Sequence, residues 1–113
     1  MLPRKNLIPL RREFKRIRKS GKLYDSPSFG LLVSYGKVPG RQAAFIVSKK
    51  VDKKSVVRHE IKRKLADAVD PFLNRIPQNT ELVFLAKTKA ATTARIEITQ
   101  EVEKILHRAQ LLS

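Results

Sequence analysis

The side chains of this chain that are best suited to bind a ligand are the cations of one segment. Residues 48–64, SKKVDKKSVVRHEIKRK, contain eight lysines and arginines against two acids. Apolar residues recur beneath these charges at helical spacing, at Val57, Ile61, Leu65 and Ala68, and a disordered basic tail has no such series. The pattern predicts a folded helix with a cationic face, and nucleic acid is the first ligand to consider.

Helical spacing divides these side chains among the faces of the predicted helix. Arg58 and Lys62 fall one turn apart on one flank, and His59 and Arg63 fall one turn apart on the outward face. Cations stacked in this way are suited to bridging successive phosphates, and arginine can bind a phosphate through two hydrogen bonds. The predicted nucleic-acid contacts of the segment and of the strand end before it are Lys49, Lys50, Lys54, Arg58, His59, Lys62 and Arg63.

The net charge of +15 is concentrated in two parts of the chain. Residues 1–22 contribute +8 and residues 48–65 contribute +6, whereas residues 66–113 are neutral overall. Such a field attracts polyanions and supplies sequence-independent affinity for nucleic acid through counterion release. We therefore predict a polyanion-binding protein whose C-terminal part is scaffold.

Residues that could do chemistry themselves are scarce. The chain has no cysteine, and its two histidines, His59 and His107, lie far apart in the sequence, so a zinc site or a Ser/His/Asp triad lacks its parts. A glycine-rich phosphate loop and a nucleophile elbow are also missing from the sequence. The acids Glu97, Glu101 and Glu103 are predicted to form the solvated face of a helix. The sequence thus predicts no catalytic residue and no metal ligand in this chain.

Periodicity predicts a single α+β domain over residues 1–113, with a small sheet packed by helices. The predicted elements are a helix at 10–19, strands at 29–35 and 42–48, a helix at 54–69, a strand at 81–87 and a helix at 94–109. Gly36 and Pro39-Gly40 predict a turn that pairs the first two strands as an antiparallel hairpin. No stretch approaches the roughly 20 apolar residues of a membrane span, and no apolar signal core follows Arg4, so a cytoplasmic protein is expected.

Four stretches of this sequence resemble the protein component of bacterial ribonuclease P, in order and spacing, over nearly the whole chain. They are MLPRKNLIPLRREF, AFIVSKKV, VVRHEIKRKL and ELVFLAK. The family's hallmark is a helix that carries Arg-Asn-Arg, one residue, and then Lys-Arg. Arg58, Lys62 and Arg63 match this motif, whereas His59 and Glu60 depart from it.

Two departures from the family pattern affect the predicted charge. Glu60 stands where the family has an arginine, and Ala66 stands where another arginine is usual. Glu60 is expected to face away from the RNA or to pair with Lys64, since an i, i+4 Glu-to-Lys pair needs no ligand to explain it. Lys53, Lys54 and Lys64 would then compensate for the lost charge.

The resemblance implies a function in tRNA processing. Proteins of this family bind a large catalytic RNA, which with its Mg²⁺ ions cleaves precursor tRNA to give the mature 5′ end, so the catalytic centre is expected in the RNA. A cleft between the first helix and the sheet is expected to take the single-stranded 5′ leader, lined here by Phe14, Arg18 and Arg11. Leu32 holds a strand position that often carries a tyrosine in the family, with Tyr35 nearby on the opposite face. No membrane and no stable protein partner are implied.

The resemblance also implies a fold like the second domain of ribosomal protein S5, in the order α-β-β-α-β-α. From pattern alone, the β-α-β crossover over residues 42–87 would be built right-handed. The family implies an uncommon left-handed crossover there, and this is the handedness we expect.

Three other functions remain open on the sequence. A ribosomal RNA-binding protein or ribosome assembly factor would have the same charge and a similar small fold. A DNA-binding regulator could use residues 54–69 as a recognition helix, but strands precede this helix where a helix-turn-helix needs another helix. A nuclease that needs no RNA is the weakest candidate, because metal-binding carboxylates are missing from the basic regions.

Overall fold

The sheet of this protein is built around two strands that are apolar on both faces. The computed structural model describes residues 2, 4–36 and 40–112, so Pro39 of the predicted turn lies outside the described residues. Six of the seven residues of β2 and five of the seven of β4 are buried, and such strands occupy the centre of a sheet covered on both sides. The four strands, in the spatial order β1-β2-β4-β3, are β1 (Lys22–Asp25), β2 (Phe29–Tyr35), β4 (Thr80–Ala86) and β3 (Arg41–Ile46).

The pairing of the strands corrects one prediction. β2 pairs with β1 and β4 in antiparallel fashion, and β3 pairs with β4 in parallel. The predicted hairpin between 29–35 and 42–48 is therefore wrong, because β4 lies between these two strands. The physical reason is burial. The apolar side chains on both faces of β4 are covered only if this strand lies in the centre of the sheet, whereas β3 has just two buried residues and can lie at the edge of the sheet.

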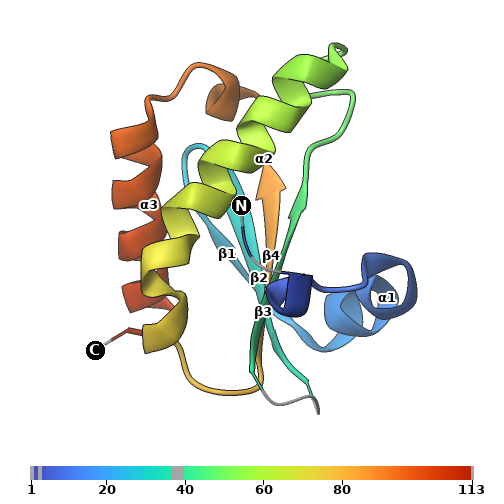
Figure 1. Cartoon of the computed structure of the whole chain (residues 1–113), viewed down its shortest axis with the longest axis vertical. Coiled ribbons are helices and arrows are strands. Elements are labelled where there is room, and N and C mark those ends of the chain that lie inside the picture. Colours follow the sequence, from blue (N-terminus) through green and yellow to red (C-terminus); the bar gives the residue numbers. More distant parts are fainter. Residues whose placement is uncertain (1, 3, 37–39, 113) are drawn as a thin grey trace.

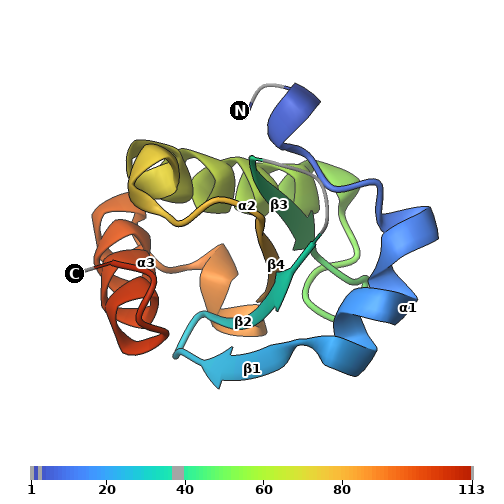
Figure 2. The same cartoon turned by 90° about the horizontal axis from the view of Figure 1, so that it is seen from below.

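Helices cover both faces of the sheet (Figures 1 and 2). α2 (Ser55–Val69) and α3 (Arg95–Arg108) lie on one face, and α1 (Leu10–Ser20) lies on the other. Three short 3-10 helices, η1 (Arg4–Asn6), η2 (Asp70–Arg75) and η3 (Thr88–Ala91), join these elements. The six predicted helices and strands occur in the predicted order, with one further strand, β1, between α1 and β2. β3, α2 and β4 form the expected left-handed crossover (Figures 1 and 2).

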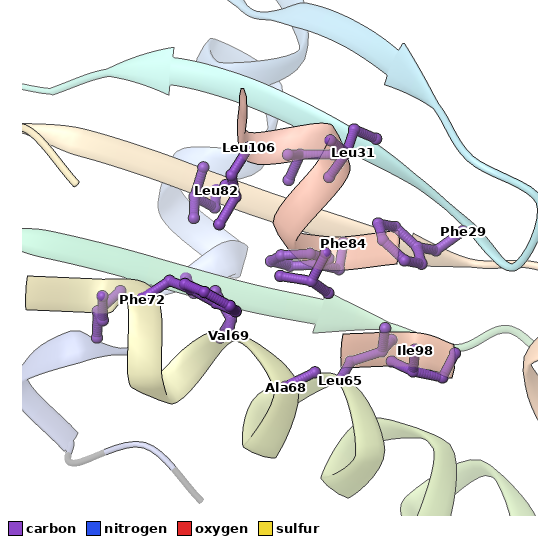
Figure 3. Packing of buried hydrophobic residues seen from close by; sticks show 14 of the residues in the cluster. Phe29, Leu31, Leu65, Ala68, Val69, Phe72, Leu82, Phe84, Ile98 and Leu106 are labelled. Carbon is purple, nitrogen blue, oxygen red and sulfur yellow. The ribbon is translucent and has the colours of Figure 1, made fainter. Parts of the chain in front are cut away.

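The larger core lies between the sheet and the helices α2 and α3 (Figure 3). Its centre is the pair Phe29 and Phe84, whose ring centroids are 5.4 Å apart, and Phe29 is fully buried, as its position on the predicted strand indicates. Ile61, Leu65 and Ala68 of α2 are buried here, and Val57 packs against them at the helix start. The predicted apolar series is therefore the face by which α2 joins the core.

A smaller core lies under α1 on the opposite face of the sheet. It contains Ile8, Ile17, Leu32, Ala44 and Val83. Ile17 is the only fully buried residue of α1, whereas five residues of α2 are buried. α1 is consequently attached to the sheet through a much narrower apolar contact than α2.

Strand β1 was not predicted from the sequence. It has only four residues, and none of them is fully buried. Such a short and largely exposed segment has no alternation of apolar and polar residues from which a strand could be predicted. Pairing with β2 and the turn that follows hold it in place. Glu101 of α3 fixes that turn by accepting hydrogen bonds from Ser26 Oγ at 2.6 Å and from the backbone N of Ser28 at 2.9 Å.

The role of Glu101 also differs from the prediction of a solvated residue. Burial opposes the charge of this carboxylate, but hydrogen bonds from Ser26 and Ser28 outweigh that cost and lower the pKa of Glu101. Among the described residues, no helix is both long and apolar enough to cross a membrane.

Candidate nucleic-acid interface

The connection between β3 and α2 presents a group of lysines to solvent. Lys49, Lys50, Lys53 and Lys54 are all exposed. The acid among them, Asp52, accepts a hydrogen bond from the backbone N of Lys54 at 2.8 Å, which closes a turn just before the helix. The positive charge of this loop is therefore available to a ligand, while the carboxylate is used within the protein.

Arg58 is directed back toward this loop. Its Nη1 donates hydrogen bonds to the backbone carbonyls of Asp52 at 3.1 Å and Lys53 at 2.8 Å. The half-buried guanidinium therefore helps to hold the lysine loop, and it retains further N–H donors for a ligand. RNA contact by Arg58 stays a prediction, now with a structural role beside it.

The other predicted contacts of α2 lie further along the helix. His59 and Arg63 are exposed and line a shallow hollow of about 500 Å³ on the outer surface of α2. Lys62 is half-buried, and its stem lines an apolar hollow of about 220 Å³ together with Ala66. The structure thus brings all seven predicted residues to the first half of α2 and the loop before it, with Lys62 on a different side from Arg63.

Ala66, where the family usually has arginine, is buried with 1% of its surface exposed. It lies against the N-terminal segment and β3, in a hollow also lined by Leu2, Leu7 and Phe45. An arginine at this position would have to displace apolar neighbours or bury its charge. The departure from the family pattern therefore has a packing reason.

Lys64 and Glu60 do not form the ion pair that their spacing predicts. The Nζ of Lys64 donates to the carbonyls of Ala90 at 3.2 Å, Ala91 at 3.3 Å and Thr93 at 3.0 Å. Three carbonyl oxygens at and just beyond the end of η3 offer this ammonium three partners at once, which one carboxylate on the same helix cannot match. Lys64 therefore fastens α2 to the segment before α3 and is a poor candidate for compensating charge toward RNA.

Glu60 is instead held by an arginine of α3. Arg95 Nη2 lies 2.6 Å from Glu60 Oε1, and Arg95 Nη1 lies 2.8 Å from Asp67 Oδ2. The guanidinium lowers the pKa of Asp67, and the two carboxylates raise the pKa of Arg95. Sequence analysis missed this contact because Glu60 and Arg95 are 35 residues apart.

The second cationic surface is formed by α1, on the other side of the sheet from α3 (Figure 2). Arg16 is the exception within it, because its Nη1 and Nη2 donate to both carboxylate oxygens of Glu81 in β4, at 3.1 and 2.7 Å. Glu81, with a further contribution from Glu13, raises the pKa of Arg16, and this ion pair ties α1 to the sheet. The other exposed cations of α1 are Arg11, Arg12, Lys15, Arg18 and Lys19.

The predicted cleft residues do not line the groove found between α1 and the sheet. Phe14 is half-buried against the smaller core, and Arg11 and Arg18 are exposed. A groove of about 760 Å³ lies between α1 and the sheet, and it is lined by Pro9, Arg12, Glu13, Arg16, Ser20, Tyr35, Gly36, Gln42 and Glu81. Sequence reasoning missed Arg12, although its position four residues before Arg16 places both on one flank of the helix.

The described residues contain no group of three or more His, Asp or Glu side chains that could hold a metal ion. The binding of metal therefore stays an expectation for the RNA rather than an observation about this chain.

Comparison with known proteins identifies the family. The family model for ribonuclease P matches residues 2–110. The chain is 34% identical over 112 residues to the ribonuclease P protein component of Dehalococcoides mccartyi strain 195, covering 96% of this chain and 88% of that protein. It is also 34% identical over 104 residues to that of Clostridium novyi, covering 88% of each.

Solved structures share the fold. The RNase P protein of Staphylococcus aureus matches with a TM-score of 0.84 at 22% identity, over 96% of this chain and 98% of that one. That of Thermotoga maritima matches with a TM-score of 0.80 at 21% identity, over 89% and 94% of the two chains. The chain therefore belongs to the ribonuclease P family, as a protein subunit of that ribonuclease.

Proposed function

We propose that this chain binds the catalytic RNA of ribonuclease P together with the 5′ leader of precursor tRNA, and so assists the removal of the leader. The observation that carries the proposal is the cationic surface of the β3–α2 loop and the first half of α2, on a helix that is anchored in the core by Ile61 and Leu65. A rigid scaffold that holds several cations loses little entropy when it binds a folded polyanion.

The two basic helices have different roles in this proposal. The surface of α2 and its loop, which faces away from the core, binds the RNA subunit. The surface of α1 binds the leader, with Phe14 available for base stacking and with Arg11 and Arg18 contacting phosphates. Stacking on an aromatic side chain is sequence-tolerant, which suits leaders of varied sequence.

The cleavage chemistry is assigned to the RNA subunit with its Mg²⁺ ions. The protein contributes binding and positioning through its cations, and none of its residues is assigned a catalytic role. It would act in the cytoplasm, with the catalytic RNA and precursor tRNA as its partners and without a stable protein partner.

Reconstitution tests this function. The purified protein is added to the catalytic RNA of the same organism at low Mg²⁺, and cleavage of precursor tRNA at the mature 5′ end is followed on a gel. We expect clear stimulation at low Mg²⁺, because the protein lowers the repulsion between two RNA molecules. No stimulation at any salt concentration, or co-purification of ribosomal RNA in place of the catalytic RNA, would contradict the proposal.

A further inference from the structure

An arginine of α3 neutralises the acid that interrupts the basic motif of α2. Glu60 stands where the family motif has an arginine, and its Oε1 accepts a hydrogen bond from Arg95 Nη2 at 2.6 Å. Arg95 also donates to Asp67 Oδ2 at 2.8 Å, about two helical turns further along the same face of α2. One guanidinium from the start of α3 thus serves two carboxylates of the basic helix.

This network has little value for stability. The side chains of Arg95, Glu60 and Asp67 are about half exposed, at 50%, 47% and 49%. Ion pairs this accessible to water contribute little to the folding of a protein. Their effect on a charged ligand is different. A carboxylate that is not neutralised repels each bound phosphate that lies within the Debye screening length.

Glu60 lies at the border of the surface proposed for RNA. It lines the same hollow as His59 and Arg63, the two exposed residues of the outward face. A bare carboxylate at this place would oppose the contacts of its neighbours. Arg95 both cancels part of this charge and draws the Glu60 side chain toward α3.

We propose that Arg95 is a positioning residue for RNA binding, which holds Glu60 and Asp67 toward α3 and neutralises them so that the basic face of α2 can approach the RNA. The inference rests on the proposed function. It extends the residues that matter for binding to α3, in a part of the chain whose net charge is zero.

A mutant cycle tests the inference on the full-length protein. Affinity for the catalytic RNA is measured for the wild type, for Arg95→Ala, and for Arg95→Ala combined with Glu60→Gln and Asp67→Asn. We expect Arg95→Ala to weaken binding roughly three- to tenfold at low salt, with the effect shrinking as salt is raised. Removing the two carboxyl charges should restore the affinity to within about twofold of the wild type.

Two control variants separate charge from folding. Arg95→Lys keeps the positive charge and should bind within about threefold of the wild type. Lys104→Ala removes a cation from the same helix, about 14 Å further along its axis, and should change affinity less than about twofold. Thermal unfolding of each variant checks that the fold is retained.

The outcomes are distinguishable. If Arg95→Ala binds as well as the wild type, or if its loss persists when Glu60 and Asp67 are neutralised, the inference is overturned, and the second result would show that Arg95 contacts the RNA directly. If the wild type itself does not bind the catalytic RNA, the proposed function is wrong, and so is the inference that rests on it.

Discussion

The two basic helices, with six cations in α1 and four in α2, use these cations differently. In α1, one cation, Arg16, makes an ion pair with the sheet, and the others extend into solvent. In α2, Arg58 holds the preceding loop and Lys64 fastens the end of η3. The comparison shows that a count of charges overstates the number of contacts available to RNA, because part of the charge of α2 maintains the fold.

The helices also differ in how they are held. α2 buries five side chains in the larger core, whereas α1 buries only Ile17. α2 therefore presents its cations from a fixed position, and α1 depends on a small apolar contact and the Arg16–Glu81 ion pair. We relate this difference to their proposed ligands, a folded RNA for α2 and a single strand for α1.

The largest expected effect tests the difference in anchoring. Leu65→Ala should lower the free energy of unfolding by about 2–5 kcal/mol, because it opens a cavity in the larger core where Leu65 is fully buried. Ile17→Ala should cost less, since the smaller core beside it can relax toward solvent, and should chiefly loosen α1. Urea unfolding measures the first effect and hydrogen exchange of α1 amides the second. Equal global destabilisation by both variants would remove the distinction between the helices.

A substitution at Phe14 tests the proposal that α1 binds the leader while α2 binds the RNA subunit. Phe14→Ala should weaken the binding of precursor tRNA with a long leader by about 1–3 kcal/mol when the aromatic stacks on a base. Affinity for the catalytic RNA alone should not change, and both affinities are measured by fluorescence titration.

Phe14→Leu serves as the matched control, because it keeps most of the apolar packing and removes the ring. If Phe14→Leu binds the leader like the wild type, Phe14 is a core residue of α1 and the stacking role is wrong.

Restoring the family arginine at the buried position of α2 should be harmful. Ala66→Arg should destabilise the protein by about 1–3 kcal/mol through overpacking, because Ala66 lies under the N-terminal segment. Thermal unfolding measures this change. A gain in RNA affinity with unchanged stability would show that the site has room for an RNA-facing arginine, contrary to the packing seen here.

The smallest expected effect concerns the stability of the protein at low pH, to which Glu101 of α3 contributes. The folded-state pKa of Glu101 lies below its ordinary value of 4.5, so its contribution to stability is present above the unfolded pKa and is lost as pH falls through the folded pKa. Unfolding free energies from pH 7 to pH 3 should therefore fall less steeply in Glu101→Gln than in the wild type. Parallel pH profiles would mean that the hydrogen bonds from Ser26 and Ser28 do not lower this pKa.

Local patterns in the sequence predicted most of the elements. The series from Val57 to Ala68 defined the helix at 54–69, which the structure places at Ser55–Val69. The hairpin failed because strand order depends on which strand buries both faces, and this is decided between strands far apart in the chain. β1 was not predicted because it has only four residues, none of them fully buried, and so short a segment leaves no period to detect.

The sequence predicted where the candidate site lies better than it predicted what each residue of the site does. Composition located the cations, but the partners of Lys64 and Glu60 lie 26 to 35 residues away. Spacing on one helix can propose only local pairs, so it assigned these two residues to each other. Which cations remain for RNA is therefore a property of the tertiary structure.

The central claim is that the basic surface of α2 binds the catalytic RNA, and the salt dependence of binding tests it most directly. For Lys62→Ala with Arg63→Ala, the slope of log affinity against log salt should flatten by about 1.4, at about 0.7 for each lost phosphate contact. Lys89→Ala with Lys104→Ala, which removes the same charge outside this surface, should leave the slope unchanged. An unchanged slope for the Lys62 and Arg63 variant, or an equal loss in both variants, would contradict the account.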